Sequence, residues 1–163
     1  MAKIYAVLGN HDPDASDERF CRFLNDAHIR LLYNKAAELP TVNLIGRVGI
    51  VDMQELRRPL GYIMQKTNPK KRSIVLDHDR QGIWVAVACG ADLVLCGHIH
   101  KGQFFPMDIL TRLANGREYF YGYGRKGKTQ FVICAGTGFF QLPIRVGINS
   151  ETVVLDIAGS EGQ

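Results

Sequence analysis

The sequence predicts a protein of the α/β class, built as a sandwich of sheet and helices. Through the first two thirds of the chain, short apolar β-prone runs alternate with segments whose apolar residues recur at helical spacing. From Arg117 onward the pattern changes to strand-like runs separated by glycine-rich turns. The length of 163 residues suits one domain, and we expect a single domain over residues 1–163.

The predicted elements of the N-terminal part begin with a strand over Ile4–Leu8, which ends at a glycine. A helix is expected after Ser16, because acidic residues favour a first turn there and apolar residues follow at i, i+3, i+4 and i+7 through Ala27. Two strands are then expected, over Ile29–Leu32 and Val42–Val51. Two glycines inside the second strand predict a bulge or a break.

A second helix is predicted where Asp52 and Glu55 form a capping-box pattern ahead of apolar residues that extend to Met64. Pro59 lies inside this pattern and is expected to kink or split the helix. The remaining predicted elements are a strand over Ser73–Asp77, a helix over Gln81–Cys89, and strands over Leu93–Cys96, Tyr119–Tyr123, Phe131–Ala135 and Thr152–Ile157.

The composition is that of an ordinary globular protein, with 46% hydrophobic and 22% charged residues. The net charge of +4 fits an anionic substrate but is too small to indicate nucleic acid. No apolar run is long enough to span a bilayer, and the first residues do not form a signal peptide. The four cysteines contain no Cys-x-x-Cys pair. We therefore expect a reduced cytoplasmic protein, while an anchor in a preceding segment stays an open alternative.

Polar side chains gather at the ends of three predicted strands. These clusters are Gly9-Asn10-His11-Asp12, Asp77-His78-Asp79 and Gly97-His98-Ile99-His100, and they hold four of the five histidines. In open α/β sheets, ligands bind beyond the carboxyl ends of the strands. Imidazole, amide and carboxylate groups together suit Mn, Fe or Zn. The simpler alternative, loop histidines with ordinary hydrogen bonds, fits a lone histidine better than four in such places.

The second and third clusters carry further local expectations. His98 and His100 are two apart on a segment expected to be extended, so both side chains can point to one side. Gly97 is expected to supply the sharp turn after the strand. Lys101 is either a phosphate contact or a solvated loop residue, and Arg145 is either a substrate contact or part of a structural turn.

These clusters are similar to the motifs of the calcineurin-like metallophosphoesterases. Residues 9–12 resemble the family's Gly-Asn-His-Asp/Glu motif, residues 97–100 resemble its Gly-His-x-His motif, and His78 resembles the metal-binding histidine between them. The last third also resembles bacterial single-domain members through Gly136-Thr137-Gly138 and Pro143-Ile144-Arg145. The resemblance implies the C-terminal part of a four-layer αββα sandwich.

The resemblance also implies a function: metal-dependent hydrolysis of a small phosphomonoester or phosphodiester by a centre with two divalent ions, Mn, Fe or Zn. His11 would protonate the leaving oxygen or stabilise charge on phosphorus, and Asp12 would orient its ring. The implied metal ligands are Asn10, His78 and His98 at the second metal and His100 at the first.

The family pattern has an earlier Asp-x-His and an earlier Gly-Asp, which have no counterpart here. The single Asp-x-His of this chain, Asp26-Ala27-His28, lies near a predicted helix end, where residues two apart do not share a face. We interpret His28 as a cation at the helix C-terminus. The expectation is thus an N-terminally truncated domain whose first metal site keeps only His100.

Two alternatives to an active enzyme follow from this truncation. One is an inactive fragment that binds a single metal ion. The other is a protein-interaction module, since lost strands would expose a sheet edge or apolar face to self-association. The sequence carries no clear nucleic-acid or membrane signal.

Overall fold

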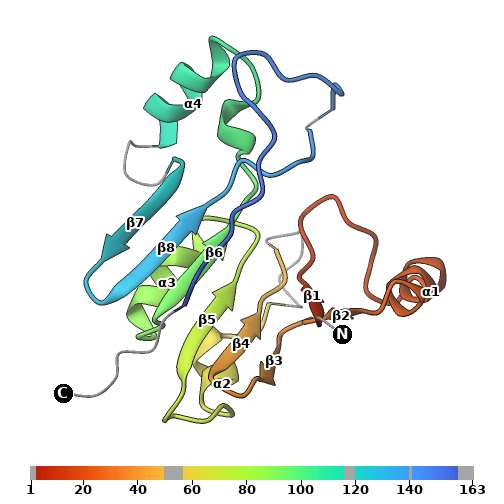
Figure 1. The fold of residues 1–163 in the computed structure, drawn as a ribbon, viewed down its shortest axis with the longest axis vertical. Coiled ribbons are helices and arrows are strands. Elements are labelled where there is room, and N and C mark those ends of the chain that lie inside the picture. Colours follow the sequence, from red (N-terminus) through yellow and green to blue (C-terminus); the bar gives the residue numbers. More distant parts are fainter. Residues whose placement is uncertain (1–2, 50–56, 116–119, 140, 158–163) are drawn as a thin grey trace.

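The computed structural model describes residues 3–49, 57–115, 120–139 and 141–157 (Figure 1). The strands are β1 (Ile4–Ala6), β2 (Ile29–Leu31), β3 (Lys35–Glu38), β4 (Val42–Gly46), β5 (Arg72–Leu76), β6 (Leu93–Cys96), β7 (Gly122–Lys126) and β8 (Thr129–Ile133). The helices are α1 (Glu18–Asp26), α2 (Leu60–Met64), α3 (Gly82–Ala88) and α4 (Met107–Asn115), with a 3-10 helix over His100–Gly102.

The main sheet has six strands in the order β3-β4-β5-β6-β8-β7, and β1 and β2 form a separate parallel pair. The four central strands β4, β5, β6 and β8 are parallel, and the edge strands β3 and β7 are antiparallel to their neighbours. A mixed sheet with flanking helices confirms the predicted α/β class. Because the central strands are parallel, their carboxyl ends meet at one edge of the sheet.

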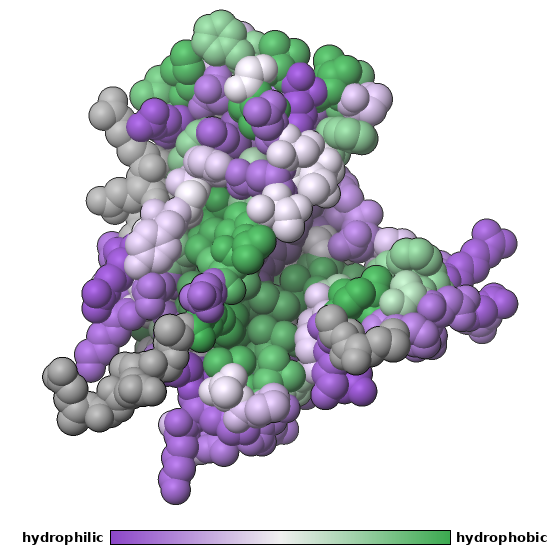
Figure 2. Space-filling model, in the orientation of Figure 1, coloured by the Kyte–Doolittle hydropathy of each residue, from purple (hydrophilic) through white to green (hydrophobic). Residues whose placement is uncertain are grey.

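The core lies between the sheet and the helices α2 and α3, which lie behind the sheet in Figure 1. Neighbouring residues along a strand point to opposite faces. In β4, Ile45 joins the helix-covered core and Leu44 joins the smaller apolar cluster on the other face. In β5, Val75 and Ile74 divide in the same way. Figure 2 shows an apolar hollow on that second face, over the central strands.

All four cysteines are free in the structure. Cys96 is buried at the end of β6, and burial raises the pKa of its thiol, which keeps it protonated and unreactive. Cys21, Cys89 and Cys134 are only partly buried. Within the described residues, the helices are too short or too polar for any of them to span a bilayer.

Two predicted boundaries shift for local reasons. Asp17 caps α1, since its Oδ1 accepts a hydrogen bond of 2.8 Å from the backbone N–H of Phe20. Pro59 does not kink α2, because the described helix begins after it at Leu60. The capping-box residues Asp52 and Glu55 lie outside the described residues.

The predicted break in the strand at residue 46 is confirmed, because β4 ends there. A Cβ atom on Gly46 would lie 2.2 Å from the Cβ of Leu32 and 2.4 Å from its carbonyl oxygen. Only glycine therefore permits this close approach of β4 to the end of β2.

Three segments differ from the sequence predictions. Strand β3 was not predicted, since Lys35–Glu38 has no alternating apolar pattern, and its pairing with β4 decides its structure. Helix α4 was also not predicted. The expected strand over Thr152–Ile157 is wrong: that segment runs extended but joins no sheet among the described residues, and Val154 is 90% exposed.

Replacing Ile133 by alanine tests the location of the core. Ile133 is 1% exposed between the sheet and its helices, so we expect Ile133→Ala to lower the free energy of unfolding by about 2–5 kcal/mol in urea titration. Ile4, which is 52% exposed, offers the same chemical change on the surface and should cost about 0.5 kcal/mol or less. Equal losses in the two variants would contradict the core described above.

Candidate metal centre

The three polar clusters predicted from the sequence line one open cleft of about 960 Å³ at the carboxyl edge of the sheet. The loop after β1 reaches this edge because the backbone N–H of Gly49 donates to the carbonyl of Leu8 at 2.9 Å. The predicted site residues in the lining are Asn10, His11, Asp12, His78, His98 and His100.

Two side-chain contacts meet at the Nε2 atom of His78, at the polar end of the cleft. The Nε2 atom of His78 lies 3.0 Å from Oδ1 of Asn10 and 3.0 Å from Nδ1 of His98. A single N–H at Nε2 can point at only one of these two atoms at a time. Two donor atoms at right angles, each about 2.1 Å from a metal ion, are themselves about 3 Å apart. The spacing therefore fits a shared divalent cation, and the amide and imidazole donors fit Mn, Fe or Zn.

The ring of His78 is held in place from several sides. The backbone N–H of Gly97 donates to the His78 carbonyl at 3.2 Å, which ties the segment after β6 to the segment after β5. The rings of His78 and His98 meet edge to face, with centroids 4.9 Å apart. Burial, and then the nearby His98, lower the pKa of His78. Both effects favour the neutral imidazole, which is the form that binds a metal ion.

The backbone around His98 differs from the expected extended segment. His98 has a φ of 72°, and His100 has a φ of 49° at the start of the 3-10 helix. The argument from period-two alternation is therefore wrong, although both side chains reach the cleft. Gly97 is not the turn residue either: it has no positive φ, and a Cβ atom there would meet nothing within 4 Å.

His100 lies beside Arg145 rather than in the converging triplet. Its Nδ1 atom is 3.4 Å from Nη2 of Arg145. That Nη2 also donates to the carbonyl of Ala135 at 2.9 Å, to Gly136 at 3.1 Å, and to Gly138. Arg145 thus holds the loop after β8 against His100. This favours the interpretation of Arg145 as a structural residue over its interpretation as a substrate contact. Burial, and then the charge of Arg145, lower the pKa of His100.

The remaining motif residues form the rim. Oδ2 of Asp12 accepts a hydrogen bond of 2.6 Å from the backbone N–H of Gly9, so this carboxylate closes the loop 9–12 into a turn. His11 is exposed and lines the cleft. The ammonium group of Lys101 lies 4.0 Å from the ring centre of Tyr121, in a separate hollow.

Comparison with known proteins finds relatives that are named metallophosphoesterases. Over 155 residues, which are 93% of this chain and 41% of the relative, the sequence is 31% identical to an uncharacterized metallophosphoesterase of Helicobacter pylori strain J99. The chain is a metallophosphoesterase homologue. A transmembrane protein with metallophosphoesterase domain from Danio rerio is 32% identical over 162 residues, covering 90% of this chain and 37% of that protein.

A third relative, an uncharacterized metallophosphoesterase of Aquifex aeolicus, is 29% identical over 164 residues, 95% of this chain and 60% of its own length. The homologue thus spans about two fifths of the length of the first two relatives. No protein-family model and no solved structure gives a match.

The possible metal ligands of this metallophosphoesterase homologue are distributed unequally between the two expected metal sites. Among the described residues, no three His, Cys, Asp or Glu side chains are grouped so that they could hold a metal ion. The triplet of Asn10, His78 and His98 contains only two such residues and is completed by an amide. The residues present therefore fit one cation at the triplet, whereas His100 has no described carboxylate beside it that would complete a second site.

A buried ion pair directly before His78 was not predicted. Asp77 is 1% exposed and accepts hydrogen bonds from Nη1 of Arg47 at 3.0 Å and from Nη2 of Arg57. Burial raises the pKa of Asp77, and the two guanidinium groups oppose that change. The sequence signal was Arg47 itself, an arginine inside an apolar run, because such residues are rarely buried without a partner.

Gly9 gives a test of the His78 position. A Cβ atom on Gly9 would lie 2.9 Å from Cε1 of His78, so Gly9→Ala should displace this ring. We expect Mn²⁺ affinity, measured by calorimetry, to fall at least about 10-fold. Gly97→Ala is the matched control, because the space beside Gly97 is open, and it should bind Mn²⁺ as the parent chain does. Equal affinities in the two variants would contradict the proposed ligand role of His78.

Asp77→Asn tests the buried ion pair. It leaves two guanidinium groups without their carboxylate, so we expect the free energy of unfolding to fall by about 3–5 kcal/mol. Glu38→Gln removes a carboxylate paired with Lys71 at the surface and should cost far less. The free energies of unfolding of both variants are measured by denaturant titration. A loss for Asp77→Asn as small as that for Glu38→Gln would refute the role of Asp77 in anchoring this edge of the sheet.

Proposed function

We propose that this chain carries the part of a metal-dependent phosphoesterase that holds one ion of a two-metal centre, and that the whole protein hydrolyses a phosphomonoester or phosphodiester. The observation that supports this most directly is the convergence of Asn10, His78 and His98, with 3.0 Å between neighbouring donor atoms. The names of the relatives support phosphoester hydrolysis in general terms.

Each residue of the cleft has a role in this proposal. Asn10, His78 and His98 hold the second ion, and His100 is the residue of this chain that contributes to the first. A bound divalent ion supplies a Lewis acid that polarises a phosphoryl oxygen. His11, exposed at the rim, donates a proton to the leaving oxygen. Asp12, through its bond to the Gly9 backbone, fixes the loop that carries His11; orientation of the His11 ring by Asp12 remains a prediction.

A second candidate is a metal-binding module without turnover. It is favoured by the uneven donor set, in which one triplet converges and His100 stands apart among the described residues. Turnover separates the two candidates, because both bind an ion at the triplet and only the enzyme hydrolyses a phosphate ester. Self-association through the apolar sheet face stays a prediction. A cytoplasmic location also stays a prediction, and for comparison the Danio rerio relative is named a transmembrane protein.

His98→Ala tests the proposed function. Loss of one of three donors should weaken Mn²⁺ binding more than about 10-fold and remove any Mn²⁺-dependent hydrolysis of a chromogenic phosphodiester. His28→Ala is the control, since His28 is an exposed histidine after α1 that does not line the cleft. Hydrolysis that persists in His98→Ala would overturn the proposal. Binding of one ion without hydrolysis would instead support the metal-binding module.

A further inference from the structure

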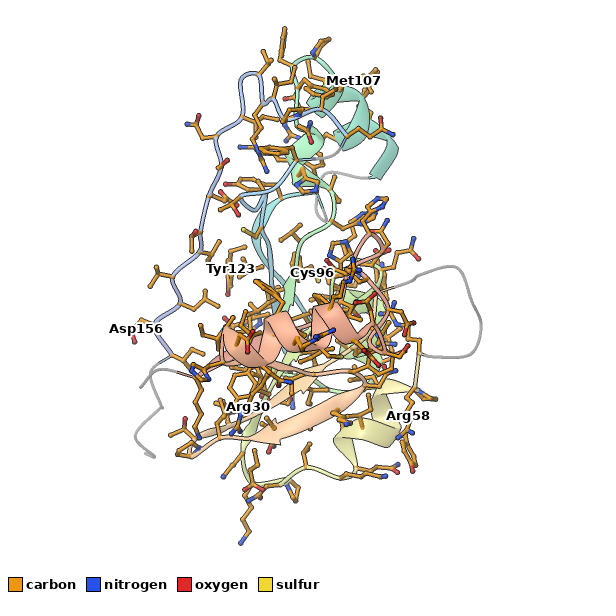
Figure 3. All side chains as sticks on the ribbon, turned by 90° about the vertical axis from the view of Figure 1, so that its right-hand side faces the viewer. Arg30, Arg58, Cys96, Met107, Tyr123 and Asp156 are labelled. Carbon is orange, nitrogen blue, oxygen red and sulfur yellow. The ribbon has the colours of Figure 1, made fainter. Side chains whose placement is uncertain are left out.

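The cleft has two ends of different chemistry. Asn10, His78 and His98 form the polar end. The other end is lined by four large apolar side chains, and this apolar wall consists of Phe104, Met107, Phe139 and Leu142. Three of the four are substantially exposed: Met107 by 47%, Phe139 by 53% and Leu142 by 56%. Figure 3 shows Met107 at the end of the molecule, beyond the strand end marked by Cys96.

The apolar wall is held in place by polar contacts beneath it. Gln103, which is 3% exposed, donates from Nε2 to the carbonyl of Leu142 at 3.0 Å. The backbone N–H of Phe105 donates to Val146 at 2.9 Å, and that of Val146 donates to Gln103 at 3.2 Å. These bonds join the segment before α4 to the segment after residue 141. The two halves of the wall are therefore fixed relative to each other before a ligand binds.

The start of α4 is fixed against the histidine loop as well. A Cβ atom on Gly102 would lie 2.4 Å from the Cα of Asp108, so the 3-10 helix and α4 pack backbone to backbone. This contact sets the position of Met107 relative to His100, which begins the same 3-10 helix. The position of Met107 relative to His100 is thus set by backbone packing.

Apolar surface continues outward from the wall. On α4, Ile109, Leu110 and Leu113 are exposed by 49%, 56% and 67%. Figure 2 shows apolar residues gathered at this end of the molecule. Two cations, Lys101 and Arg112, and one carboxylate, Asp108, line the separate hollow beside α4, so positive charge exceeds negative charge there. Apolar surface beside cations is complementary to a molecule with an alkyl chain and an anionic head.

We propose that the phosphate ester bound in this cleft is amphiphilic, with its phosphate at the polar end and its alkyl or acyl chain along the apolar wall. This inference rests on the proposed function and names its substrate class. A small polar phosphate ester would leave the wall in contact with water, whereas an alkyl chain removes apolar surface on both partners. Each buried methylene strengthens binding by about twofold to fourfold, the lower value applying to a chain that stays partly exposed.

The experiment measures the Mn²⁺-loaded chain by calorimetry with two non-hydrolysable probes, methylphosphonate and hexylphosphonate. The probes differ by five methylenes, so we expect hexylphosphonate to bind at least about 30-fold more tightly. Met107→Ser and Leu142→Ser should each reduce this ratio several-fold. Leu113→Ser is the matched control, because Leu113 is also apolar and exposed on α4, at 67%, but does not line the cleft, and it should keep the ratio.

The outcomes separate the two proposals. Methylphosphonate binding that is lost in His98→Ala, together with equal affinities for the two probes, would keep the proposed function and overturn the amphiphilic substrate. Loss of the chain-length ratio in Leu113→Ser as much as in Met107→Ser would also overturn it, because the outer face of α4 and not the cleft would then hold the chain. Absence of phosphonate binding to the Mn²⁺-loaded chain would overturn both proposals.

Discussion

The carboxylate of Asp77 lies where water is excluded, and two arginines from distant parts of the chain donate to it. Arg47 follows β4, Arg57 precedes α2, and Asp77 follows β5, so the ion pair joins three elements at the edge where the cleft opens. Breaking one partner of such a group strands a buried charge, which is far more costly than losing a surface pair. The backbone of His78, the next residue, is fixed by this constraint.

The ion pair is not fully satisfied. The Nε atom of Arg47 and the Nε and Nη1 atoms of Arg57 are buried and have no hydrogen-bond partner among the described residues. A polar network of this kind contributes less to stability than an apolar core of the same volume. Its contribution here is positional, because it fixes the residue before His78 while Gly9 leaves room for the His78 ring. The network thus positions the imidazole of His78 in the cleft, and the protein gives up some stability for this.

The sequence predicted the central strands and the placement of the polar clusters, because both depend on local patterns. The runs in β4, β5 and β6 are apolar and end at polar residues, and parallel strands necessarily bring such ends together. The direction in which each side chain points could not be predicted from the sequence. Asp77 and His78 are neighbours in one cluster, yet one faces a buried ion pair and the other the cleft, and only the tertiary partners decide which.

The elements that could not be predicted lack a local signal. The positive φ of His98 arises from the path of the loop and is unusual for a non-glycine residue. Strand β3 is polar and depends on β4 for its structure. The segment Thr152–Ile157 has the composition of a strand but finds no neighbouring strand to pair with among the described residues. Strand propensity says only that a side chain suits a pleated surface. It does not tell whether another strand lies alongside to pair with the segment.

In the proposed enzyme, the two ends of the cleft contribute differently to ligand recognition. Three protein donors leave coordination positions of a cation open, which suits catalysis but selects little beyond an anionic oxygen. A phosphate group is common to very many metabolites, so selectivity must come from the rest of the ligand and from the surface that meets it. In this cleft that surface is the apolar wall, fixed by Gln103 and by the packing of Gly102 against α4. In the proposed enzyme, specificity would therefore depend on the segments around α4, and phosphoester hydrolysis would depend on the residues at the strand ends.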